Sequence, residues 1–107
     1  MRLALTLIAL LLAAPVLAQQ QRPATCSRDL FQNEAGFRLQ QTRLAAAASA
    51  DQAIQCRTYR EHVAYLQKAR SVFATCQTGR QREENVAQMD QSLADYRVLL
   101  ANRCGRR

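Results

Sequence analysis

The sequence has 107 residues, of which 49% are hydrophobic and 21% are charged, and its formal net charge is +7. The sequence contains one histidine and four cysteines, too few for a cysteine/histidine metal site to be expected beside disulfides. It contains three glycines, which are too widely spaced for a glycine-rich phosphate loop. We therefore expect no metal and no cofactor. Fourteen of the fifteen basic residues are arginine and alanine is abundant, which hints at a GC-rich bacterial genome.

Residues 1–18 have the layout of a cleavable signal peptide. Arg2 supplies a positive charge, residues 3–14 form an uncharged apolar run, and Pro15 precedes the small or apolar residues 16–18. The run is shorter than the roughly 20 residues of a membrane-spanning helix, which disfavours an uncleaved anchor. We expect cleavage after Ala18 and a periplasmic or secreted protein that carries 14 basic residues against 8 acidic ones.

Residues 19–25 are polar and contain a proline, so we expect them to form a disordered lead-in. The domain 26–107 is rich in Ala, Gln, Leu and Arg, which favours an all-α fold of three helices. The first helix is expected at about 27–47, and two apolar lines run along it. The first line recurs every seven residues and comprises Leu30, Phe37 and Leu44. The second line comprises Phe31, Ala35 and Leu39.

The second helix is expected at about 50–77. Its apolar stripe combines a seven-residue repeat with two residues in between: Tyr59, Val63, Leu66, Ala69 and Phe73. Ser49 and Gln52 have the spacing of a capping box, and Asp51 suits a helix N-terminus. Because residues 45–50 contain neither proline nor glycine, one continuous helix through this join is an alternative.

The third helix is expected at about 80–104. Its apolar residues alternate spacings of three and four: Val86, Met89, Leu93, Tyr96 and Leu100. Thr78 and Gln81 match a capping box, while Gly79 competes as the left-handed residue that ends the second helix. Either interpretation places a turn near 77–80, which gives an up-down-up bundle.

Four cysteines in an exported chain of this size predict two disulfides. Cys56 and Cys76 are about 30 Å apart along one helix, whereas bonded cysteines need Cα atoms roughly 4.4–6.8 Å apart. Pairing Cys26 with Cys56 leaves a height difference of about 24 Å in an up-down-up bundle. The sequence therefore predicts Cys26–Cys76 and Cys56–Cys104. Buried free thiols are the alternative, which export disfavours.

The sequence contains no convincing set of catalytic residues, and we expect the protein not to be an enzyme. His62 is the only histidine and falls at heptad position d beside Val63 and Leu66, where a core role is favoured over a general base. Glu83 and Glu84 are adjacent on a helix, so their carboxylates do not face each other as an acid/base pair would.

Five arginines are expected to gather where the Cys56–Cys104 bridge joins the second and third helices. We call this set the basic cap: Arg57, Arg60, Arg103, Arg106 and Arg107. Such a cluster can attract phosphates or carboxylates of lipopolysaccharide, of cell-wall polymer or of an acidic protein. The alternative is a solvated end that aids solubility. Export makes nucleic acid an unexpected partner.

The line of Phe31, Ala35 and Leu39 is the best hint of an interaction surface, for a homodimer, a partner helix or a chaperone-like patch. The alternative is that Phe31 covers the Cys26–Cys76 bridge and the rest is ordinary surface. We expect a non-catalytic binding or structural module whose partner is a protein or an anionic envelope polymer. A periplasmic stress chaperone is the alternative, and an enzyme or redox carrier comes third.

Overall fold

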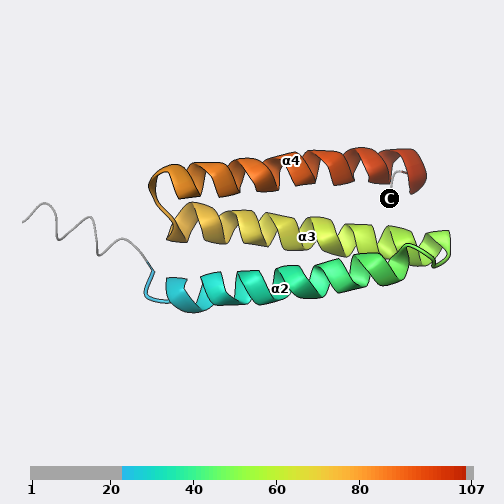
Figure 1. Cartoon of the computed structure of the whole chain (residues 1–107). Helices are drawn as coiled ribbons and strands as arrows, with labels where there is room; N and C mark the ends of the chain where they lie inside the picture. The colour runs from blue at the N-terminus through green and yellow to red at the C-terminus, as the bar shows by residue number, and fades with distance from the viewer. Residues whose placement is uncertain (1–22, 106–107) are drawn as a thin grey trace, which may run out of the picture.

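The computed structural model describes residues 23–105, which form three α-helices and no β-strand within that range (Figure 1). α2 spans Cys26–Ala47, α3 spans Gln52–Cys76 and α4 spans Gly79–Arg103. The all-α prediction is confirmed, and each helix end lies within two residues of its expected position. The expected signal peptide, residues 19–22 of the lead-in, and 106–107 lie outside the described residues. No described helix is long and apolar enough to cross a membrane.

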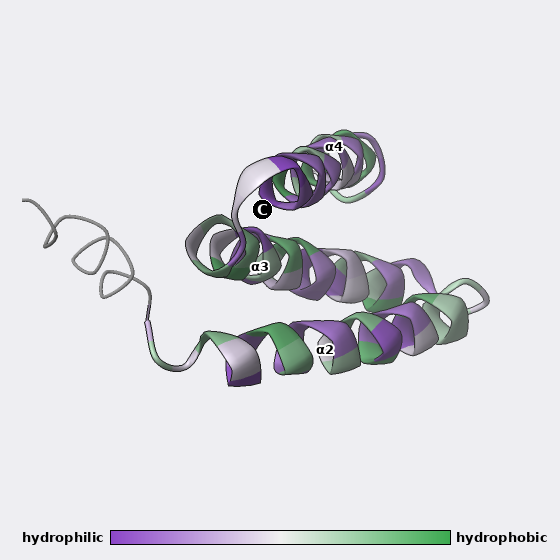
Figure 2. Cartoon of the chain, turned by 60° about the vertical axis from the view of Figure 1, so that its left-hand side comes forward, coloured by the Kyte–Doolittle hydropathy of each residue, from purple (hydrophilic) through white to green (hydrophobic). Residues whose placement is uncertain are grey.

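The helices run up, down and up, with α3 between the other two (Figure 1, Figure 2). No Cα atom of α2 lies within 8 Å of a Cα atom of α4, so each outer helix packs on α3 and not on the other. The bundle is therefore open. In a closed three-helix bundle each helix buries one face, whereas α3 here packs against a helix on each of two sides.

A small apolar core joins α3 to α4. Its buried members are each at most 5% exposed: Leu66, Ala69, Met89 and Leu93. Half-buried side chains pack around them: Phe37, Val63, Tyr65, Phe73 and Tyr96. Most of these residues belong to the predicted stripes of the second and third helices, and only Phe37 comes from α2. Burying one Leu or Met side chain fully contributes roughly 1.5–3 kcal/mol, so this core is the main apolar support of α4.

The turn between α2 and α3 separates them into two helices, so the continuous helix considered above is wrong. α2 ends at Ala47, and Asp51 caps α3 by accepting a hydrogen bond from the Ile54 backbone N–H at 2.9 Å. The expected capping box of Ser49 with Gln52 is also wrong. Asp51 takes the cap because its carboxylate is one residue before the helix, and Gln52 Nε2 donates instead to the Arg103 carbonyl.

The turn between α3 and α4 consists of two extended residues, Gln77 and Thr78. Thr78 occupies the N-cap position of α4 but makes no capping hydrogen bond with its side chain, so the expected box of Thr78 with Gln81 is wrong. Gly79 has a φ of 62°, a left-handed conformation that costs glycine little, and it opens α4. Gly79 is thus left-handed, as the alternative interpretation expected, but it is the first residue of α4 and not the residue that ends the second helix.

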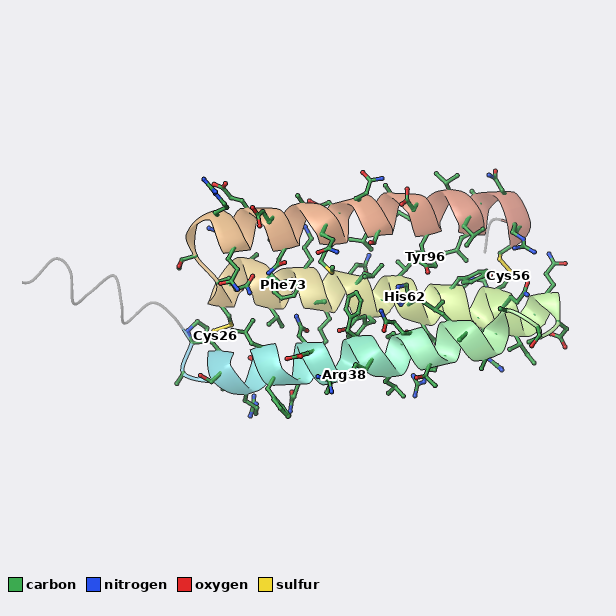
Figure 3. All side chains as sticks on the ribbon, viewed as in Figure 1. Cys26, Arg38, Cys56, His62, Phe73 and Tyr96 are labelled. Carbon is green, nitrogen blue, oxygen red and sulfur yellow. A yellow bond between two sulfur atoms is a disulfide. The ribbon has the colours of Figure 1, made fainter. Side chains whose placement is uncertain are left out.

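Two disulfides close the open ends of the two helical hairpins, in the connectivity that the sequence predicts. Cys26 bonds Cys76 with their Cα atoms 5.3 Å apart, at the end opposite the turn at 48–51. Cys56 bonds Cys104 with their Cα atoms 5.7 Å apart, at the end opposite the turn at 77–78. Each outer helix is consequently tied to α3 at both of its ends (Figure 3).

Candidate functional site

The described members of the basic cap come from the start of α3 and the end of α4. Arg57 and Arg103 each adjoin a cysteine of the Cys56–Cys104 bridge, and both are exposed. Within residues 23–105 neither guanidinium makes an ion pair or a hydrogen bond, since the ion pairs there engage other arginines. These two groups are therefore available to a ligand.

Arg60 has a different role in the basic cap. Its Nη2 atom lies 3.4 Å from the Cys104 carbonyl oxygen, to which it donates a hydrogen bond at the end of α4. A cation at this place complements the negative end of the helix dipole. Arg60 thus helps to hold the end of α4 on α3, and Arg106 and Arg107 lie outside the described residues.

The line of Phe31, Ala35 and Leu39 is exposed along α2, and its last residue, Leu39, also lines a groove together with Tyr65 and Val72 of α3. Phe31 is 73% exposed, Leu39 is 49% exposed, and Ala35 is exposed between them. An ion pair of 2.9 Å between Glu34 and Arg38 lies beside the line, and Arg38 is labelled in Figure 3. A phenyl ring this exposed shares little contact with the protein, which argues against Phe31 as the cover of the Cys26–Cys76 bridge.

Between α2 and α3 lies a set of polar side chains, largely buried, that the sequence analysis missed. We call it the polar seam: Asn33, Gln40, His62 and Tyr65. Asn33 Nδ2 donates to the Ala69 carbonyl at 3.2 Å, and the Tyr65 hydroxyl donates to the Asn33 carbonyl. His62 Nδ1 is 3.3 Å from Gln40 Oε1. α2 is thus attached to α3 by hydrogen bonds in addition to apolar contacts.

The buried positions of α2 follow a seven-residue repeat that differs from the predicted one. They are Cys26, Asn33, Gln40 and Ala47. The predicted line of Leu30, Phe37 and Leu44 is only half-buried. Each of these residues follows a buried residue by four positions and so lies about 40° further round the helix, towards the edge of the buried face. The signal that could have revealed this repeat is Cys26. Because Cys26 must face Cys76 to form the predicted disulfide, the residues seven and fourteen positions later, Asn33 and Gln40, must face α3 as well.

His62 is the point at which side chains from all three helices meet. It is 5% exposed, as its heptad position predicted, and it touches Gln40 of α2. The Tyr65 ring is stacked with it at a distance of 6.2 Å between ring centroids. The Tyr96 ring of α4 meets it edge-on, with the ring centroids 4.6 Å apart, and both His62 and Tyr96 are labelled in Figure 3. Burial lowers the pKa of His62 below 6.5, because a cationic ring would lose solvation.

The open bundle leaves a groove near the turn at 48–51. It has a volume of about 440 Å³, and all three helices contribute to its lining, together with Ala48, which follows the last residue of α2. The lining residues are Leu44, Ala48, Tyr59, Asp95, Tyr96 and Leu99. Asp95 is its only charged residue and accepts a hydrogen bond from Gln91 Nε2 at 3.1 Å. The groove exists because α2 and α4 do not close over α3.

Within residues 23–105, no three histidine, cysteine or carboxylate side chains gather as a metal site requires. Glu83 and Glu84 are both exposed near the start of α4. The chain matches no protein-family model, no curated protein and no solved structure.

Proposed function

We propose that the chain is a small exported, non-catalytic module that binds an anionic partner of the cell envelope, a protein or a polymer, through its basic cap. The observation that carries the proposal is the placement of Arg57 and Arg103. They come from different helices, are exposed, make no side-chain hydrogen bond or ion pair within residues 23–105, and adjoin the two cysteines of one disulfide. Guanidinium groups bind carboxylates and phosphates bidentately, so two of them at one end suit a ligand with repeated anionic groups.

Export is supported by two independent features of the chain. Residues 1–18 have the pattern of a signal peptide, and the domain holds two disulfides, which persist in oxidising compartments. After cleavage the chain keeps 14 basic residues against 8 acidic ones, and this excess steers it towards anionic surfaces.

The test is binding of the mature chain to purified lipopolysaccharide at low and at high salt. The variant Arg57→Gln/Arg103→Gln is compared with Arg80→Gln/Arg82→Gln, which removes two exposed arginines from the other end of α4. We expect the first variant to lose about tenfold in affinity, equivalent to about 1.4 kcal/mol, and the second variant much less. The difference should shrink at high salt, where exposed charges are screened.

Equal losses in the two variants would show that only net charge matters, and would contradict a site at the basic cap. Absence of binding by the unaltered chain to lipopolysaccharide, to peptidoglycan with its teichoic acids and to acidic envelope proteins would contradict the function itself.

A stress chaperone is a second candidate function, favoured by the exposure of Phe31 and Leu39 on one side of α2. Exposed apolar side chains on a helix can bind the apolar segments of an unfolded client. Light scattering of an aggregating client tests it, with Phe31→Ser/Leu39→Ser compared with Ile54→Ser/Val98→Ser, which removes two exposed apolar residues from other helices. A chaperone acting through α2 loses protection only in the first variant; equal loss, or none, contradicts it.

A further inference from the structure

We propose that His62 is an acid-sensitive latch: protonation of its ring loosens α2 from α3, while the two disulfides keep the helices tied together. The proposal concerns the fold and does not depend on anion binding by the basic cap. It rests on the contacts of His62, on the different ways in which α2 and α4 are held, and on the covalent closure of both hairpins.

Among residues 23–105, the surroundings of His62 accommodate a neutral ring and offer no counter-ion to a cation. α2 presents the neutral amide of Gln40, α3 presents Tyr65, and α4 presents Tyr96. The carboxylates nearest in sequence to these groups, Glu61 and Asp95, are exposed. A buried charge without a counter-ion is costly, so protonation favours an opened state in which water reaches the ring.

The hydrogen bond of His62 shows where a second proton must go. With Gln40 Oε1 as the acceptor, Nδ1 carries the proton of the neutral ring and Nε2 receives the next one, so Nδ1 still donates to Gln40 when the ring is a cation. Nε2 has no hydrogen-bond partner within residues 23–105, whereas every fully buried side-chain nitrogen or oxygen there has one. Nε2 therefore keeps some contact with solvent, and a proton can reach it without prior unfolding.

α2 is the helix that a charge at His62 releases, because its attachment is the more polar of the two. Two of its four buried positions are amides, Asn33 and Gln40, whose hydrogen bonds water can replace. α4 is held instead by the apolar core with Met89 and Leu93, and by the ion pair of Asp90 with Arg70. Acid leaves the apolar contacts of that core unchanged.

The covalent closure of each hairpin limits how far α2 can move. The turn at 48–51 fixes its C-terminal end, and the Cys26–Cys76 bond fixes its N-terminal end. The helix can therefore separate from α3 only along its middle, where the polar seam lies. Return to neutral pH restores the contact without a search for the partner helix.

The pH dependence has a definite sign. Because burial lowers the pKa of His62 below 6.5, the folded state binds fewer protons there than the open state does. The stabilisation is complete above pH 6.5 and is lost as the pH falls through the lowered pKa. Below both pKa values, each unit by which the pKa of the closed state lies under that of the open state reduces the ratio of closed to open molecules tenfold.

The experiment uses the disulfide-bonded mature chain, in which His62 is the only histidine, so its ring resonances are assigned directly by NMR. The ring is titrated, and protection of α2 and α4 amides from hydrogen exchange is followed over the same pH range. The variant His62→Gln is the control, since its side chain stays neutral and polar. We expect a His62 pKa below 6.5 and α2 protection that falls with that pKa only in the unaltered chain, while α4 protection persists.

A His62 pKa at or above 6.5 would overturn the proposal. It would also fail if α2 lost protection with the same pH dependence in His62→Gln, because carboxylates would then be responsible, or if α2 and α4 loosened together. Should the variant not fold, the titration and the exchange profile of the unaltered chain still decide between these outcomes.

Discussion

At Gly36 the ring of Tyr65 occupies the space that a larger residue on α2 would need. A Cβ atom added to Gly36 would lie 2.8 Å from Tyr65 Cε2, closer than such atoms approach each other in proteins. The same tyrosine donates its hydroxyl hydrogen to the Asn33 carbonyl. The glycine, which only lowers helix propensity when judged from sequence, therefore lets an aromatic ring from α3 lie close against α2.

We predict that Gly36→Ala destabilises the protein by about 1–2 kcal/mol. Overpacking and a lost hydrogen bond together cost more than the roughly 1 kcal/mol that alanine gains in helix propensity. Denaturant unfolding of the disulfide-bonded chain measures the change. In a Tyr65→Ala background the clash is absent, so the same substitution should become stabilising. A stabilising Gly36→Ala in the unaltered chain would contradict the close contact.

Among the helices, α3 has a well-defined start, which the side chain of Asp51 caps. The Asp51 carboxylate accepts a hydrogen bond from the Ile54 N–H, and Gln55 Nε2 donates to the Ala48 carbonyl across the turn. These bonds satisfy backbone groups that a helix leaves unpaired at its ends. They fix where α2 stops and α3 starts, in an alanine-rich join that has no proline or glycine to end a helix.

We predict that Asp51→Ala costs about 1 kcal/mol, the usual loss for an N-cap side chain, while Ser49→Ala changes stability little. Both substitutions remove an exposed polar side chain from the same turn, so one is the control for the other. Thermal unfolding followed by circular dichroism compares them. A larger loss in Ser49→Ala would restore the capping box that the structure replaces.

For the whole molecule, two hairpins share α3 and are each closed by one disulfide. The bridges join residues separated by 50 and 48 positions, and each is expected to contribute roughly 3–4 kcal/mol by restricting the unfolded chain. Because small domains are stable by only about 5–15 kcal/mol in total, the bridges supply a large share in a chain with so few buried apolar residues.

We predict that the two disulfides differ in what their loss releases. Replacing Cys26 and Cys76 by serine should expose the amides of α2 to hydrogen exchange, because the polar seam alone remains to hold it. Replacing Cys56 and Cys104 should lower global stability by a similar roughly 3–4 kcal/mol but leave α4 protected in the folded state by its apolar core. Equal loss of protection in α2 and α4 in both variants would contradict this asymmetry.

Much of the fold could be predicted because it depends on periodicity and length. The helical spacing of apolar residues predicted that Leu66 and Met89 lie in the core. The fixed rise of a helix excluded two of the three possible pairings of the four cysteines, and the remaining pairing is the one observed. The openness of the bundle could not be predicted, since apolar stripes show which face is buried but not how widely two outer helices are splayed. The choice of Asp51 over Ser49 as the cap depends on a turn geometry that spacing does not define.

The candidate sites were predicted less completely. The exposed arginines of the basic cap follow from the disulfide pairing, but the bond of Arg60 to the end of α4 requires coordinates. The polar seam was missed because Asn33 and Gln40 count as surface residues in any amphipathic pattern. They are buried because partners for their amide groups lie on α3, and sequence spacing does not reveal hydrogen-bond partners.

The overlap of the two disulfide rings has a consequence for survival among proteases. One ring contains the chain from Cys26 to Cys76 and the other contains it from Cys56 to Cys104, so every peptide bond between Cys26 and Cys104 lies inside at least one ring. A single cleavage anywhere in that span leaves both fragments covalently joined. A chain with this connectivity can be nicked and remain one molecule, whereas linking Cys26 to Cys56 and Cys76 to Cys104 would let a cut between Cys56 and Cys76 separate the fragments.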